Sequence, residues 1–147
     1  MSKQTYGNSG DAYIITAATV ANTTPVVSTI VDLRRFDCFG LVLSAGGGAA
    51  TLDGAWKIEM SNDFTPAATN ASYGQAPNAA TAIWVDVTAS AMWVDAIAAV
   101  AHATASSTKQ AIQPKYGVGF RSMRVTFTGT TGSATVSASI FAKSWSA

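Results

Sequence analysis

The sequence predicts an all-β protein, an antiparallel β-sandwich or jelly roll of about seven or eight strands, the number suggested by the spacing of its turn residues. In residues 124–143, Ser and Thr alternate with small or apolar residues on both sides of the glycine-bounded segment 129–132. Two period-2 stretches around such a segment are typical of a β-hairpin. In residues 56–61, apolar and polar residues also alternate, as in a strand with one buried face.

Length and composition indicate one folded domain with an unusually uncharged surface. The chain has 147 residues, of which 48% are hydrophobic and 12% charged, and its net charge is +1. A domain of this size buries about 70% of the surface of its unfolded chain, so it needs no metal or disulfide to fold. Because protein interfaces are depleted of charge, we expect much of the surface to lie against other protein; the alternative is a small domain with a mild surface. We expect an N-terminal arm at 1–11 and a single β-sandwich domain at 12–147.

The first half of the chain contains four segments with the composition of strands. They are β-branched or alternate between apolar and polar residues, and turn residues separate them. These segments are 13–20, 26–33, 38–44 and 56–61. The turn after the fourth is predicted at Ser61-Asn62-Asp63, whose side chains can bond the backbone. Trp56 is expected in the core.

The second half alternates between long loops and strands. Residues 65–81 and 105–119 are rich in Ala, Asn, Ser, Thr, Pro and Gly, and we expect them to form surface loops. A strand is predicted at 83–87, with Trp84 as a core anchor. The closing strands are expected at about 121–128 and 134–143, paired with each other.

Residues 90–104 are ambiguous. Trp93, Ile97 and Val100 fall at helical spacing, the segment is rich in Ala, and Ser90 is suited to the N-cap position. These features predict one short helix within 90–104. An edge strand around Trp93 is the alternative.

Charge and hydropathy argue against several classes of partner. The nine Lys and Arg residues are scattered, without the basic stripe that nucleic-acid binding requires, so we expect no nucleic-acid partner. The apolar-looking stretch 89–105 contains Asp95 and His102 and does not suit a membrane span. The N-terminus lacks an apolar signal-peptide core, which leads us to expect a cytoplasmic product. The one cysteine, Cys38, is expected to be a small buried hydrophobe.

No set of catalytic groups is apparent. His102 is the one histidine of the chain, and it follows no Gly-x-Ser-x-Gly motif. We expect it to be structural, which leaves a hydrolase with His102 as base as the third hypothesis for function. The acidic residues occur singly, and Ser61-Asn62-Asp63 is expected to be a turn rather than part of a Ca²⁺ site. We therefore expect no enzymatic activity, no metal and no cofactor.

The order of several short motifs resembles a known class of protein. Ser61-Asn62-Asp63 ends one strand, Trp84-Val85-Asp86-Val87 follows, and the segment 121–127 (Arg-Ser-Met-Arg-Val-Thr-Phe) precedes the Gly-Thr-Thr-Gly turn and a Ser/Thr-rich strand. Over about residues 38–143 this order resembles the small β-sandwich structural proteins of tailed bacteriophage virions, such as capsid decoration or cement proteins. The resemblance implies a non-enzymatic virion subunit that assembles in the host cytoplasm. Its partners would be the major capsid protein or other virion proteins, and it would form a homo-oligomer, for which we suppose a trimer.

Aromatic residues in or beside loops are the candidate interface residues, because Trp and Tyr anchor both protein interfaces and bound sugars. These residues are Tyr6, Tyr73, Trp93, Tyr116 and Trp145. The alternative function is a carbohydrate- or receptor-binding jelly-roll module of a phage fibre or tail, with an exposed aromatic pair drawn from Tyr73, Trp93 and Tyr116.

Arg121 is the candidate for a structural ion pair. If residues 121–127 are extended, Arg121 lies on the same face as the apolar side chains, and Arg124 lies on the opposite face. We expect Arg121 to pair with an acidic group such as Asp86 or Asp63. The alternative is that its guanidinium binds the carboxylate of a ligand.

Overall fold

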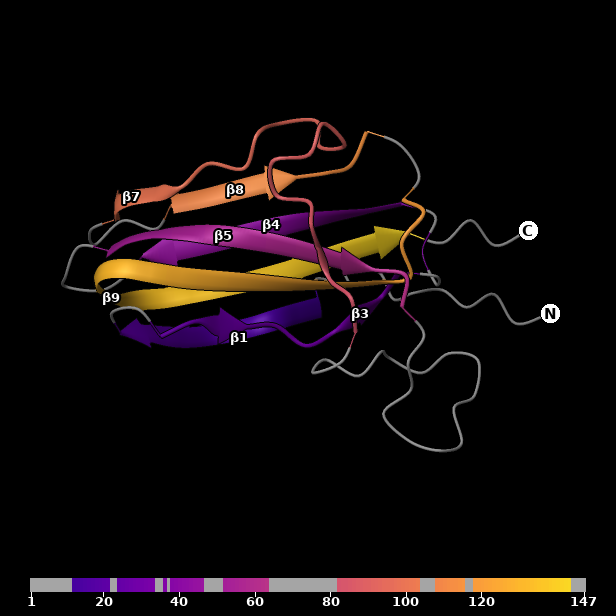
Figure 1. The fold of residues 1–147 in the computed structure, drawn as a ribbon. Helices are drawn as coiled ribbons and strands as arrows, with labels where there is room; N and C mark the ends of the chain where they lie inside the picture. The colour runs from indigo at the N-terminus through magenta and orange to yellow at the C-terminus, as the bar shows by residue number, and fades with distance from the viewer. Residues whose placement is uncertain are drawn as a thin grey trace.

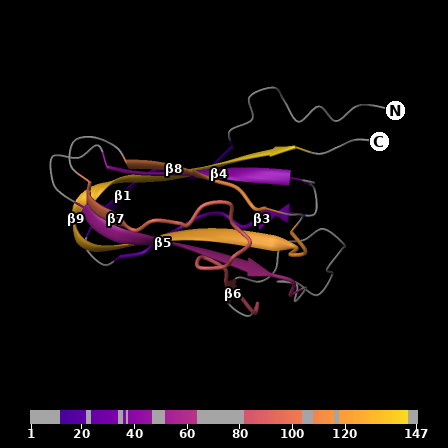
Figure 2. The same cartoon turned by 90° about the horizontal axis from the view of Figure 1, so that it is seen from above.

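The computed structural model describes residues 12–21, 24–33, 36, 38–46, 52–63, 82–103, 108–115 and 118–143. In these ranges the chain is all-β, without a helix, and its strands form two antiparallel sheets consistent with a β-sandwich, as the sequence predicts (Figure 1). Seen from above, the two sheets form two layers (Figure 2). The predicted arm at 1–11 lies outside the described residues.

One layer, here called sheet A, has the strand order β1–β9–β4–β8. Its strands are β1 (Ala12–Ala21), the second half of β9 (Ser122–Lys143), β4 (Cys38–Gly46) and β8 (Thr108–Ile112). The edge strand β1 has two register shifts against β9, one before and one after Ile15. These irregularities place both Ile14 and Ile15 in the core. Ala17, within the second shift, has a positive φ of 29°.

The other layer, sheet B, is built around the first half of β9. β5 (Leu52–Ser61) pairs with β9 on one side, and β2 (Val26–Val27) and β3 (Val31–Asp32) pair with it on the other. β6 (Val85–Asp86) and β7 (Val100–Ala103) pair with the far edge of β5. Between β2 and β3, the Ser28 N–H donates to the Val125 carbonyl at 2.8 Å, and Ser28 Oγ accepts from the Val125 N–H at 2.9 Å. Ser28 thus bridges the irregular edge to β9.

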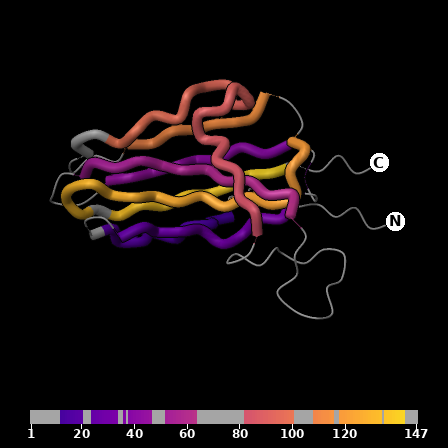
Figure 3. The backbone as a smooth tube through the Cα atoms, in the orientation of Figure 1, coloured from indigo at the N-terminus to yellow at the C-terminus, as the bar shows by residue number. Residues whose placement is uncertain are grey.

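β9 passes from one sheet to the other, and this corner replaces the predicted hairpin (Figure 3). Residues up to Gly132 pair with β5 in sheet B, and residues from Ser133 onward pair with β1 in sheet A. Gly132 has a φ of 78°, which glycine adopts without strain. The segments 121–128 and 134–143 therefore pair with other strands in different sheets, and the hairpin prediction is wrong. Alternation and glycine indicate a bend, but they do not reveal which sheet the chain enters after it.

The core lies between the two sheets and confirms the predicted alternation of 56–61. Trp56, Ile58 and Met60 are at most 3% exposed, and the Trp56 ring packs edge-on against Phe127 with 4.8 Å between centroids. The other large side chains that are almost completely buried are Val20, Leu41, Leu43, Leu52, Met123, Val125 and Val136. Cys38 is exposed, which corrects the expectation that it is buried. β4 begins at Cys38, and the alternation places its neighbour Phe39 inside instead.

The predicted helix within 90–104 is wrong. The segment forms turns and an isolated bridge between Trp93 and Pro114 before it enters β7, so the edge-strand alternative is closer to the structure. The Val94 N–H donates to the Gln113 carbonyl at 2.9 Å, and the Gln110 side-chain amide both donates to and accepts from the Ala98 backbone. The segment is thus held to the Gln110 side chain and to the residues that follow β8. These bonds outweigh the small helical preference of alanine.

Candidate functional site

An ion-pair cluster lies on the outer face of sheet B. The β5–β9 register places Glu59 directly opposite Arg124. Arg124 Nε donates to Glu59 Oε2 at 2.8 Å, and Lys57 Nζ donates to Glu59 Oε1 at 2.7 Å. The Glu59 side chain is only 10% exposed. Burial alone would raise the pKa of Glu59, but the bonds from Arg124 and Lys57 outweigh burial and lower it. The carboxylate is therefore held ionised between two cations.

Trp84 covers this cluster instead of lying in the core as predicted. The Arg124 guanidinium lies 4.3 Å from the centroid of the Trp84 ring, a cation–π contact. The Trp84 indole N–H is buried and has no hydrogen-bond partner among the described residues. The three charged groups bond to one another and join β5 to β9, which makes the cluster a structural fastening between strands.

The expected pairing of Arg121 with an acidic group such as Asp86 or Asp63 stays a prediction. The Asp86 carboxylate accepts hydrogen bonds from the Thr88 hydroxyl at 2.6 Å and from the Thr88 N–H at 2.9 Å. These two bonds are the main causes that lower the pKa of Asp86. The arginine that the structure places against a buried carboxylate is Arg124. The cross-strand register, which the sequence does not reveal, selects it.

The side chains of Ser61-Asn62-Asp63 bond backbone groups as expected, whereas the turn itself stays a prediction, because β5 ends at Ser61 and Asn62 and Asp63 are irregular. Ser61 Oγ donates to the Ile83 carbonyl at 2.7 Å, and Asp63 Oδ2 accepts from the Ile83 N–H at 3.0 Å. Asn62 Oδ1 accepts from the Arg121 N–H at 3.0 Å. These side chains join the end of β5 to the segments that lead into β6 and β9. Their oxygens thus bond backbone groups, and no group of three potential metal ligands forms among the described residues.

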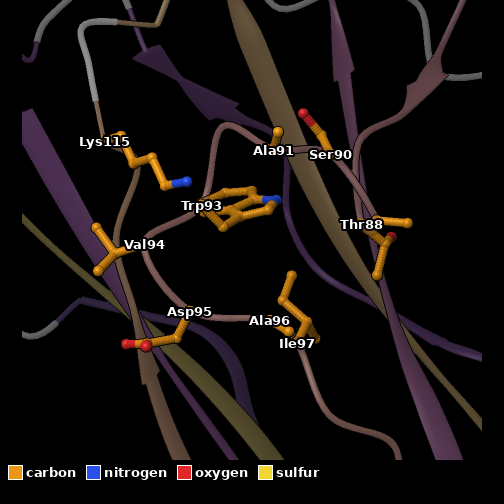
Figure 4. A pocket seen from close by; sticks show the side chains of 10 residues that line it. Thr88, Ser90, Ala91, Trp93, Val94, Asp95, Ala96, Ile97 and Lys115 are labelled. Carbon is orange, nitrogen blue, oxygen red and sulfur yellow. The ribbon is translucent and has the colours of Figure 1, made fainter.

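A pocket of about 460 Å³ lies beside the segment 88–97. Figure 4 shows the residues that line it, with the indole of Trp93 at their centre and the polar side chains of Ser90, Asp95 and Lys115 around it. Trp93 is 3% exposed, its N–H donates to the Val87 carbonyl at 2.8 Å, and its ring packs edge-on against Phe39. Trp93 is thus a core residue at the pocket wall. This burial corrects the prediction that Trp93 lies in an interface or stacks on a sugar.

The outward side of sheet A is the most distinctive surface of the described residues. We call it face A and define it by the outward positions of the four strands: Tyr13, Thr19, Cys38, Gly40, Val42, Ser44, Lys109, Ala111, Thr135, Ser137, Ser139 and Phe141. Tyr13 is 64% exposed and Phe141 46%. The Phe141 ring lies over Gly40, where it occupies the place that a Cβ atom would take. Among these side chains, Lys109 carries the one charge.

Four of the predicted interface residues, Tyr6, Tyr73, Tyr116 and Trp145, lie outside the described residues. His102 belongs to β7, but its side chain also lies outside them. Sequence reasoning missed Tyr13 and Phe141. Phe141 could have been found from the alternation of side chains along the strand. It lies between Ile140 and Ala142, which face inward like Ala138, so Phe141 faces outward.

Comparisons with known proteins give no match: no family model, no curated protein and no solved structure is similar to this chain. Among the described residues, no helix has the length and apolar character that crossing a membrane requires.

Proposed function

We propose that the chain is a non-enzymatic structural protein of a bacteriophage particle, in the manner of a capsid decoration subunit, and that it acts through contacts with other proteins. The resemblance of its motif order suggests the class. The observation that carries the proposal is face A, a whole sheet face with exposed aromatic rings and a single described charge.

The composition of face A is that of a protein interface. Aromatic residues are enriched in interface cores, and charged residues are depleted there. Tyr13 and Phe141 are the exposed rings, on the neighbouring strands β1 and β9, and Val42 and Ala111 add smaller apolar side chains on β4 and β8. A free surface of a soluble domain would carry more Lys and Glu. The face is therefore suited to being covered by protein.

The charged groups support a structural role. Glu59, Arg124 and Lys57 bond to one another, and Asp86 bonds to Thr88. The Glu59 carboxylate joins β5 to β9, and the Asp86 carboxylate fixes the local chain direction at Thr88. Their bonds explain their lowered pKa values without a reacting group.

The test is co-sedimentation with capsids of the phage whose genome encodes the chain, prepared without this protein. We expect the protein to sediment with the capsids and to saturate at a fixed ratio to the capsid protein. Ser137→Glu, in face A, should abolish sedimentation. Thr126→Glu is the matched control, since it lies on the same strand, is also half-buried and faces outward from sheet B. Failure of the wild-type protein to bind capsids or any other part of the particle would refute the proposal.

A carbohydrate- or receptor-binding module is the second candidate, and the pocket beside 88–97 favours it. Thr88, Ser90, Asp95 and Lys115 supply hydroxyl, carboxylate and ammonium groups around a volume of about 460 Å³, the size of a small-ligand site. A glycan array tests it. Binding that Lys115→Ala and Asp95→Ala both remove would support this function, and an array without binding would reject it.

A further inference from the structure

Face A must be covered by something if it serves as an interface, and we propose that a second copy of this chain covers it. The two copies would pack sheet against sheet around a two-fold axis that runs along the strands. The inference names a partner for the same face on which the proposed function rests.

The size of face A fits a stable dimer. β4 contributes nine residues, and at about 3.3 Å per residue and 4.8 Å between strands, four strands span roughly 30 by 19 Å. This projected area is about 570 Å². The solvent-accessible area of the face is larger, because side chains protrude from the sheet. Standard interfaces bury about 800 Å² on each partner. Face A is therefore close to the area that a specific complex requires.

The polar groups of face A suit an identical partner. Ser44 and Ser137, both half-buried, lie at its centre, and a hydroxyl both donates and accepts hydrogen bonds. A hydroxyl can therefore bond to the same group on another copy, whereas a carboxylate or an ammonium group would repel its own copy. The absence of charge among the described side chains of β9 and β4 on this face is what self-association requires.

In this dimer, the strand order keeps Lys109, the one described charge of face A, away from Lys109 of the other copy. A two-fold axis along the strands sets β1 of one copy over β8 of the other, and β9 over β4. Lys109, on β8, then faces the uncharged β1 strand, at the level of the register shift around Ala17. Tyr13 faces Ala111, because both lie at the level of Val42 and Ser139. Phe141 lies at the level of Gly40, so the Phe141 rings of the two copies meet beside the axis.

The symmetry follows from the shape. A flat face that packs against itself forms an isologous contact, which a two-fold axis generates and a three-fold axis does not. The expected particle in solution is therefore a dimer of two 15.1 kDa chains, instead of the trimer supposed from the sequence.

The single cysteine allows a direct geometric test. Cys38 is exposed and lies on β4 at one end of face A. In the proposed packing, the two copies of β4 are offset by about one strand spacing across a gap of about 10 Å, so the two Cys38 Cα atoms lie roughly 11 Å apart. A short bis-maleimide should therefore join two wild-type chains covalently, and Cys38→Ser should remove the product.

The main experiment measures mass by size exclusion with light scattering at about 100 µM protein, a concentration that detects even weak dimers. We expect a dimer for the wild type and for Thr126→Glu, and a monomer for Ser137→Glu, with a dissociation constant raised at least about tenfold. Circular dichroism checks that both variants are folded. A wild-type monomer, a trimer, or equal dissociation constants for the two variants would overturn the inference. So would a dimer that the bis-maleimide fails to join.

The capsid assay separates this inference from the proposed function. A monomer that sediments with capsids through face A would assign the face to another virion protein and reject the second copy. A dimer that binds no part of the particle would support the second copy and reject the virion role.

Discussion

Replacing Gly54 with alanine should destabilise the protein by about 2 to 3 kcal/mol, because the new methyl group has no space. A Cβ atom at this position would lie 2.6 Å from the Thr128 carbonyl oxygen and 2.8 Å from Phe127 Cε1. Ordinary carbon contacts are about 3.5 to 4.0 Å. Both obstacles are fixed: Thr128 contributes backbone of the neighbouring strand, and Phe127 is 0% exposed and packed against Trp56.

The magnitude follows from two opposing effects. Overpacking a well-filled core costs about 1 to 3 kcal/mol, and the upper end applies where a ring and a backbone atom must both move. Replacing glycine by alanine also restricts the unfolded chain, which returns about 0.4 to 1 kcal/mol. For a chain of this length, the net loss corresponds to a fall in Tm of about 5 to 10 °C.

Gly40→Ala is the matched control. A Cβ atom at Gly40 would also collide with an aromatic ring, at 2.7 Å from Phe141 Cε1. Phe141 is 46% exposed in the single chain, however, and at protein concentrations too low for the proposed dimer its ring can swing into solvent. We therefore expect Gly40→Ala to change the free energy of unfolding by less than about 1 kcal/mol.

Urea denaturation of the three proteins, followed by Trp fluorescence, measures both effects. Gly54→Ala should lower the midpoint without changing the slope. Adding Phe127→Leu should recover part of the loss, since the ring clash disappears and the clash with the Thr128 carbonyl remains. Equal losses at Gly54 and Gly40 would refute the reasoning, because the mobility of the obstacle would then not decide the cost.

Three further predictions concern strain, charge and a buried hydrogen bond. Ala17→Gly should raise the free energy of unfolding by about 0.5 to 1 kcal/mol, because φ at Ala17 is 29°, where alanine is strained and glycine is not. The control Ala55→Gly, in a regular strand, should lower the free energy of unfolding by a similar amount. A lower free energy of unfolding for both variants would contradict backbone strain at Ala17. Glu59→Gln should cost about 2 kcal/mol at neutral pH, mostly through Arg124, since the half-exposed Lys57 adds little. The pKa of Glu59 is lowered from its ordinary value of 4.5. Its contribution to stability is therefore complete above pH 4.5 and is lost as the pH falls through the lowered pKa. Urea titrations from pH 7 to pH 2 measure this loss, and a difference in the free energy of unfolding between wild type and Glu59→Gln that does not narrow on acidification would refute the pairing. Trp93→Phe should cost about 1 kcal/mol in thermal unfolding, because the Val87 carbonyl loses the indole donor at 2.8 Å and keeps only the Ser90 N–H at 3.0 Å; an unchanged Tm would show that the indole bond contributes nothing.

Local alternation was enough to predict much of the fold. The period-2 pattern of 56–61 placed Trp56, Ile58 and Met60 inside, and the structure confirms all three. The short polar side chains of Ser61-Asn62-Asp63 predicted a turn, because such groups bond nearby backbone wherever they occur. The period-2 segments and the turn residues that separate them predicted the all-β class. These features are local, and they depend on only a few neighbouring residues.

Partner choice could not be predicted in the same way. The glycines at 129–132 indicate a bend. The residues before it pair with β5, and those after it pair with β1 and β4, and the positions of these partner strands depend on the whole chain. Arg121 was the candidate for an ion pair because side-chain alternation places it on the same face as apolar residues. The β5–β9 register instead sets Arg124 opposite Glu59. Trp93 has helical spacing, and burial against Phe39 holds it in an irregular segment.

The sequence by itself determined which residues face inward along regular strands such as 56–61, because side chains alternate on an extended chain. Only the tertiary structure decided which strands are neighbours, and through them the position of the ion pair, the corner in β9 and the uncharged face A. Pairing between distant strands joins residues far apart in the chain, and its free energy depends on all of them at once.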